Sequence, residues 1–517
     1  MSVPVSCSRL AGLVAHVTRF IMVNRRPHAA SLPSRAGLTS TTRPDIIPRG
    51  DRTAPRRNRQ GTEYSPESQE SALRPSTRTS HHSPSSTHLA QAATVRLCAA
   101  RGPLGAATAL ARTPSFVLAS LLFLVQMLAH FAVLARGAEY LATRLTIDDT
   151  YYYLQTAWNH ATLGFPTFDG VSRTNGFQFL WYLILWCAAR FVPTKQSLLP
   201  VALGISAVFV ALPYFFFHAV GKRYHSFALA ASLSFVWFAT YVAPWGTLTG
   251  MENSLHLFVS VWVLFEVLTF FHRLREGSRA SVWRLTLALV ANGYCRVDSG
   301  VYSAVLFCVC VLALVLNEGN LSSAWRVHGK SVCLCILLAM GAAAIQLGVY
   351  HYWNGTVIPI SGLVKFASGG LDSTLITRVE DVFRGGLPYL PGRGPLLVFC
   401  SIYLLLILGS TCISLWLIKT RSSTGWAAAC RAYLALLFAS TAYCAALLAS
   451  PVSDFPLWYF SPVTVFWIYS LGLSVSLVGS FGGTQMQRAS KRRTCVRAAL
   501  VVFSLGCVGC PRFDGHL

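Results

Sequence analysis

Residues 115–135 read SFVLASLLFLVQMLAHFAVLA, a stretch in which no side chain carries a full charge. An α-helix rises about 1.5 Å per residue, so about 20 such residues cross the hydrocarbon core of a bilayer. Further apolar stretches follow at 176–192, 198–220, 226–243, 252–271, 284–295, 299–316, 331–350, 395–418, 430–449, 458–481 and 497–510. The pattern predicts an all-α protein, a polytopic transmembrane helical bundle with about eleven crossings.

The bulk composition excludes a soluble globular protein. Of the 517 residues, 53% are hydrophobic and only 12% are charged, whereas soluble domains carry about 25% charged residues. The net charge of +24 would suggest a nucleic-acid partner in a soluble protein. Here, however, Lys and Arg fall in the N-terminal region and in short gaps between apolar stretches, as they do in cytoplasmic loops. We therefore expect a lipid bilayer as partner and no nucleic acid.

Residues 1–112 differ in composition from the rest of the chain. They are rich in Ser, Arg, Pro and Thr, and the first sixty residues contain eleven Arg but only two acidic residues, Asp45 and Asp51. Such a composition cannot bury a core, so we predict a disordered basic region ahead of a transmembrane domain over 113–510. An Arg-rich, acid-poor segment also fits an organelle transit peptide. A cytosolic tail or a mispredicted start codon are the alternatives.

The distribution of basic residues predicts the topology, because Lys and Arg concentrate in cytoplasmic loops. The N-terminal region and the basic gaps near Lys222, Arg273, Arg326, Lys419 and Arg488 are assigned to the cytoplasmic side. Five segments then lie on the opposite side: 136–175, 244–253, 296–298, 351–394 and 450–457. This scheme offers one apolar stretch too many before Lys222, so either 176–192 or 198–220 must be re-entrant or interfacial, or the scheme is wrong there.

The first outer segment contains two adjacent acidic residues, Asp148 and Asp149, followed by Thr150 and three Tyr. Two neighbouring carboxylates raise the pKa of one of them, and burial raises it further. Such a pair can supply a general base or hold a divalent cation. The alternative is a solvated start of a loop.

Four later stretches add to this pair. They are Arg173-Thr174-Asn175-Gly176-Phe177-Gln178-Phe179-Leu180-Trp181, Thr249-Gly250-Met251-Glu252-Asn253, Cys295-Arg296-Val297-Asp298-Ser299-Gly300, and Tyr352-Trp353-Asn354 continuing to Lys365. A fifth, Pro456-Leu457-Trp458-Tyr459-Phe460-Ser461-Pro462, precedes a late apolar stretch. In this order, over 113–481, they resemble the GT-C superfamily of membrane glycosyltransferases. The branch with bacterial arabinofuranosyltransferases is the most similar. Phe179, Val297 and Ser299 depart from its pattern.

The resemblance implies a GT-C-type bundle and an inverting enzyme. Such enzymes take a sugar from a polyprenyl phosphate, such as dolichyl phosphate, and pass it to an acceptor hydroxyl on the non-cytoplasmic face. It implies Asp148 as the base, and Asp149 as an assisting group or as the ligand of a divalent cation. Arg296 and Lys365 are the implied ligands of the donor phosphate. The implied residues for the acceptor or sugar are Glu252, Asn175, Trp458 and Tyr459. The acceptor is a glycan, a lipid or a protein.

Simpler interpretations stay open for single residues. Glu252 could cap the helix that follows it, since an acidic group is favourable in a first turn. Arg296 and Asp298 could form a structural ion pair, and Lys365 could be an ordinary loop lysine. Trp458 and Tyr459 suit the aromatic belt at a membrane surface.

Two other functions are alternatives to the enzyme. Intramembrane charges and broken helices also suit a transporter or lipid flippase. The departures at Phe179, Val297 and Ser299 suit a non-catalytic relative of the family. The long N-terminal region and the sequons at Asn320 and Asn354 favour the endoplasmic reticulum membrane, ahead of a plastid or mitochondrion.

Overall fold

The computed structural model describes residues 114–241, 248–278, 282–357, 359, 393–420, 425–449 and 457–480. Within these residues the chain forms helices and no strand, apart from one isolated bridge between Thr167 and Arg173. The all-α prediction is therefore confirmed for this part of the chain. The predicted disordered region 1–112 and the apolar stretch 497–510 lie outside it.

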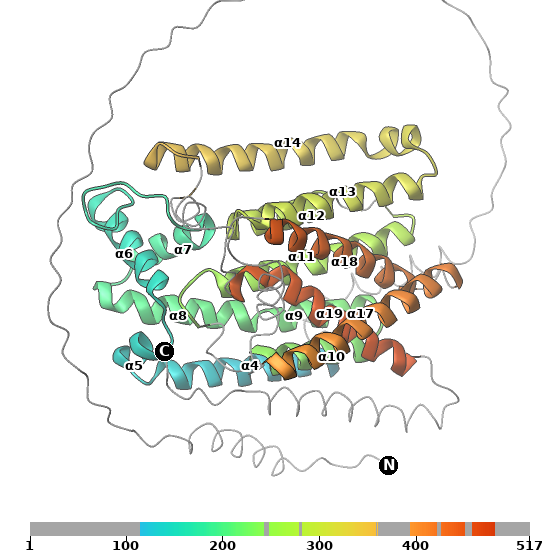
Figure 1. Cartoon of the computed structure of the whole chain (residues 1–517), viewed down its shortest axis with the longest axis horizontal. Helices are drawn as coiled ribbons and strands as arrows, with labels where there is room; N and C mark the ends of the chain where they lie inside the picture. Colours follow the sequence, from blue (N-terminus) through green and yellow to red (C-terminus); the bar gives the residue numbers. More distant parts are fainter. Residues whose placement is uncertain are drawn as a thin grey trace, which may run out of the picture. The chain divides into compact units, whose positions relative to one another are not determined.

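Most helices follow the predicted apolar stretches, but the helix Leu321–Asn354 starts ten residues before the stretch 331–350, and the helices Ala138–Arg144 and Asp148–Leu163 lie in the predicted outer segment 136–175. Figure 1 shows how the helices are arranged. The N-terminal half contains α4 (Pro114–Leu134), α5 (Ala138–Arg144), α6 (Asp148–Leu163), α7 (Phe179–Ala189), α8 (Lys195–Ala211), α9 (Pro213–Arg223) and α10 (Phe227–Tyr241). The later helices are α11 (Asn253–Arg275), α12 (Val282–Cys295), α13 (Ser299–Asn317), α14 (Leu321–Asn354), α17 (Arg393–Thr420), α18 (Gly425–Ala449), the 3-10 helix η2 (Leu457–Phe460) and α19 (Ser461–Ser480).

Six helical segments of the described residues are long and apolar enough to cross a membrane. They are Pro114–Leu134, Lys195–Arg223, Asn253–Arg275, Ser299–Asn317, Leu321–Asn354 and Gly425–Leu447. Four shorter apolar helices accompany them, so a multi-pass helical membrane protein is supported. The count of about eleven crossings stays a prediction.

The two early apolar stretches form helices of different length. Helix α7 has 11 residues, which at 1.5 Å per residue gives roughly 16 Å, about half the hydrocarbon thickness. Helices α8 and α9, in contrast, follow one another as a single 29-residue span, because Pro213 occupies the first turn of α9, where a missing N–H costs nothing. Of the two stretches, α7 is the shorter helix, and its re-entrant or interfacial placement stays a prediction.

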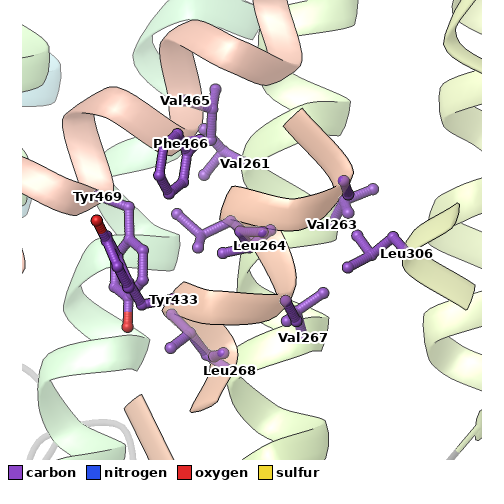
Figure 2. Packing of buried hydrophobic residues seen from close by; sticks show 14 of the residues in the cluster. Val261, Val263, Leu264, Val267, Leu268, Leu306, Tyr433, Val465, Phe466 and Tyr469 are labelled. Carbon is purple, nitrogen blue, oxygen red and sulfur yellow. The ribbon is translucent and has the colours of Figure 1, made fainter. Parts of the chain in front are cut away.

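Helix α11 lies at the centre of the main apolar cluster. Within its most apolar window 83% of the residues are buried, as expected for a helix that is apolar on every side. Figure 2 shows Val263 beside Leu306 of α13, whereas Tyr433 of α18 and Tyr469 of α19 lie on the other side of Leu264. In α14, by contrast, only 17% of the residues of the corresponding stretch are buried.

A second apolar cluster supports the end of the bundle where α11 begins. It joins α6, α7 and α8 through Leu154, Trp181 and Leu203, and includes Met251 and Tyr350. Trp181 and Leu203 are fully buried. This cluster fixes α6 and α7 against the residues that precede α11, and so positions the candidate site.

Candidate functional site

Arg296 lies at the centre of the site, in the short turn between α12 and α13. Its Nη1 donates to Oε1 of Glu252 at 2.6 Å, and its Nε donates to Oδ1 of Asp298 at 3.1 Å. The guanidinium also lies 4.0 Å from the ring centroid of Tyr459, within cation–π range. Arg296 is only 2% exposed. The structural ion pair with Asp298 is thus present, and Glu252, 44 residues earlier in the chain, completes it.

Tyr443 connects this network to the C-terminal helices. Its hydroxyl lies 2.6 Å from Oδ2 of Asp298 and 2.9 Å from the carbonyl oxygen of Tyr459, and can donate to either. Helix α18 and η2 are therefore held beside the turn that carries Arg296. Sequence reasoning missed Tyr443, which lies inside an apolar stretch and belongs to no recognisable motif.

Glu252 is 1% exposed and immediately precedes α11. Its side chain makes no capping hydrogen bond to the helix, so the capping interpretation is not what the structure shows. Its Oε2 accepts no hydrogen bond from any residue that the structure describes, although the Tyr153 hydroxyl of α6 lies close enough to interact with the carboxylate. Burial raises the pKa of Glu252, and the Arg296 guanidinium opposes this rise.

The stretch that carries Glu252 is held between α6 and α7. Thr150 Oγ1 donates to the carbonyl oxygen of Thr249 at 2.5 Å, and Trp181 Nε1 donates to that of Gly250 at 3.0 Å. Gly250 has a φ of +78°, and a Cβ placed there would lie 2.5 Å from Cγ2 of Thr150. Only glycine tolerates both the positive φ and the close approach of Thr150, so packing explains why this motif has a Gly here.

Asp148 and Asp149 form the first turn of α6, where negative charge is favourable to the helix dipole. Both side chains are exposed, and neither makes an ion pair or a side-chain hydrogen bond with a described residue. Asp149 and Tyr153 are four residues apart, so they share one face of α6. Because Tyr153 interacts with Glu252, the acidic turn lies at the same end of the bundle as Arg296.

Asn175 is buried and ties two outer segments together. Its Nδ2 lies 3.3 Å from the carbonyl oxygen of Tyr350 and 3.1 Å from that of Thr356. The turn at 174–176 is thereby joined to the end of α14 and to the residues after it. A bond from Val297 N to Oε1 of Gln178, 3.3 Å long, links the same region to the Arg296 turn.

The three departures from the family pattern keep contacts of their own. Phe179 packs against Tyr350 and Tyr294, with ring centroids 6.2 and 5.5 Å away. Ser299 Oγ lies 2.8 Å from Nε2 of His256, one turn along α11 from Glu252. Val297 uses its backbone N–H, as described above. None of the three opens a gap in the described site.

Arg173 is a cation at this end that sequence reasoning left without a role. Its guanidinium lies 5.9 Å from the ring of Phe165 and 5.6 Å from that of Tyr352, and it makes no ion pair within the described residues. Its side chain is exposed. Its position directly before Thr174-Asn175 was the available signal.

Two predicted site residues cannot be placed. Lys365 lies outside the described residues, and for Trp458 only the backbone, in η2, is described. The part of the chain that the structure describes contains no group of three His, Cys, Asp or Glu side chains suited to a metal ion. A Mg²⁺ ion needs only one or two carboxylates when substrate phosphates supply further oxygens, so Asp148 and Asp149 would fit that mode.

Five of the motif segments therefore meet at one end of the bundle: the acidic turn of α6, the 174–176 turn, the stretch before α11, the Arg296 turn, and η2. Comparisons of the chain with protein-family models, with curated proteins and with solved structures returned no match.

Proposed function

We propose that the protein is an inverting membrane glycosyltransferase that takes its sugar from a polyprenyl phosphate. The observation that supports this best is the meeting of an exposed acidic helix turn, Asp148-Asp149, with a buried network built on Arg296. The segments that form this site lie far apart in the sequence, from Asp148 to Tyr459. They nevertheless converge at the predicted outer end of the bundle. The endoplasmic reticulum membrane is the location that this function favours.

In the proposed reaction the acceptor hydroxyl attacks the anomeric carbon of the donor. The bond between that carbon and the phosphate oxygen breaks, and the polyprenyl phosphate leaves with the bonding pair. The proton of the hydroxyl passes to the Asp148 carboxylate, whose exposed position at the start of α6 lets a substrate approach it. Asp149 assists, or holds a divalent cation against the phosphate.

The leaving phosphate needs positive charge. Arg296 is engaged by two carboxylates and an aromatic ring, so the geometry favours it as the residue that positions Glu252 and Tyr459. Arg173, which has no carboxylate partner among the described residues, is better placed to meet a phosphate with its planar fork. Lys365 remains the second proposed phosphate ligand.

For the sugar or acceptor we propose Glu252, Asn175, Trp458 and Tyr459. Glu252 is the clearest candidate contact, since its buried carboxylate lies between Arg296 and the Tyr153 hydroxyl. A sugar hydroxyl that donates to this carboxylate would make a charge-assisted hydrogen bond. Asn175 and Tyr459 support this region by the contacts described above.

The test is sugar transfer in membranes that contain the chain, with radiolabelled polyprenyl-phosphate mannose, glucose and arabinose as separate donors. We expect transfer with the parent chain and its loss with Asp148→Asn. Glu139→Gln is the matched control, because it removes an exposed carboxylate of α5 that belongs to no motif. Equal transfer by the parent and by Asp148→Asn would remove Asp148 from the mechanism.

A transporter or flippase is the alternative, and the same membranes distinguish it. If no donor is consumed but labelled polyprenyl-phosphate sugar crosses reconstituted vesicles only when the chain is present, the enzyme proposal is wrong. If neither transfer nor crossing occurs, a non-catalytic role is favoured.

A further inference from the structure

A second group of charged residues lies at the other end of α11. Because α11 has 23 residues, its two ends are about 35 Å apart. The arginine cluster is formed by Arg223 at the end of α9, Arg273 and Arg275 at the end of α11, and Arg284 in the first turns of α12. It is independent of the proposed glycosyltransfer site.

Arg223 is the least satisfied member of the arginine cluster. It is repelled by Arg273 and Arg284 and attracted by Glu266, so three like charges share one nearby carboxylate. Its guanidinium lies 5.5 Å from the ring of Phe265. Its Nη1 is buried and has no hydrogen-bond partner in the part of the chain that the structure describes. A buried N–H of this kind costs free energy until an acceptor reaches it.

The carboxylates near the cluster do not balance it. Glu266 is 3% exposed and its Oε1 lies 2.9 Å from Nη2 of Arg284. Glu276 pairs with His272 at 3.1 Å, and its Oε1 is 3.9 Å from Arg275. Within the described residues Arg223 and Arg273 make no ion pair, so positive charge is left over where α9 and α11 end.

We propose that the arginine cluster binds the phosphate headgroup of an anionic lipid. Arginine suits phosphate because its planar fork donates two parallel hydrogen bonds. A phosphate oxygen would give Nη1 of Arg223 its acceptor and would separate the like charges. The sequence assigns this end to the cytoplasmic side, where anionic lipids are concentrated.

Two exposed aromatic residues favour a lipid over a soluble anion. Trp283, next to Arg284, is 55% exposed, and Phe227, which begins α10, is 54% exposed. Trp is enriched at the level of the lipid headgroups, where its ring is apolar and its N–H is wet. The proposed site thus combines arginines for a phosphate with an exposed Trp ring for the headgroup region.

The test uses the full chain in nanodiscs of phosphatidylcholine, with and without phosphatidylserine, and compares the unfolding temperature in the two. We expect phosphatidylserine to raise the unfolding temperature of the parent by several degrees. Arg223→Gln and Arg273→Gln should each lose most of this shift relative to their own value in phosphatidylcholine. Arg326→Gln, which removes an exposed arginine outside the cluster, should keep it.

Arg273→Gln keeps the proposal testable if Arg223→Gln does not fold, since Arg273 has no ion pair to lose. An equal shift in all three variants, or no shift in the parent, would overturn the lipid site. Inorganic phosphate added to phosphatidylcholine nanodiscs is the second arm. If it reproduces the whole shift and Arg223→Gln abolishes that effect, the ligand is a soluble anion and the lipid assignment is wrong.

Discussion

Among single residues, Arg296 is the one whose loss should cost the most stability. It is buried, and its removal would leave Glu252 and Asp298 as unpaired buried or half-buried carboxylates. Breaking a buried pair by removing one partner costs about 3–5 kcal/mol. We therefore expect Arg296→Gln to unfold well below the parent in detergent, as measured by thermal unfolding. The exposed Arg136→Gln should unfold with the parent; if Arg296→Gln does so too, the network is not structural.

Asp169 gives a pH prediction in the loop between α6 and α7. The N–H groups of Val171 and Ser172 and the hydroxyl of Thr167 all donate to its Oδ1, and they hold its pKa at about 2. A depressed pKa stabilises the folded loop above the unfolded value of about 3.9, and this contribution is lost as the pH falls from there towards 2. Hydrogen exchange of the 165–175 peptide should therefore show a gain in opening between these pH values, and Asp169→Asn should show no such step.

At the level of elements, the docking of α6 on the stretch before α11 depends on Gly250. Any residue other than glycine would be strained by the positive φ at this position, and its Cβ would also clash with Cγ2 of Thr150. We expect Gly250→Ala to lower stability by about 1–3 kcal/mol. Thr150→Ser removes the clashing methyl but keeps the hydroxyl that bonds Thr249. The double variant should therefore recover part of the loss, and simple additivity in a thermal-unfolding cycle would show that the two residues do not touch.

The same elements show what the sequence could and could not predict. Apolar length places α4, α11 and α13 within a few residues of their observed bounds, because these helices must span or fill a membrane-sized core. It could not choose between 176–192 and 198–220, since both are apolar and the sequence alone does not show that α7 stops after 11 residues.

The sequence could not predict which individual residues from distant segments contact one another. Charge distribution predicted that the motifs share one face, and the described motif segments do lie at one end. The Asp298 partner of Arg296 was predicted from its place in the same motif, but Glu252 and Tyr459 are brought to Arg296 by tertiary packing alone. Tyr443 was missed for the same reason, whereas Arg173 stood beside the Thr174-Asn175 motif and was passed over.

For the whole molecule, the two charged regions imply a definite orientation in the membrane. The loop with Gly170 lies at the end with the acidic turn, and Gly277 follows the arginines that end α11, about 35 Å away along that helix. Epitope tags inserted after Gly170 and after Gly277 should therefore be exposed on opposite faces. In cells whose plasma membrane alone is permeabilised, an antibody should reach the Gly277 tag and an N-terminal tag, and should reach the Gly170 tag only after all membranes are opened. Tags at Gly170 and Gly277 that become accessible together would mean that the charge rule misassigns this bundle. The proposed site would then face the cytoplasm, where a donor built for the opposite leaflet could not reach it.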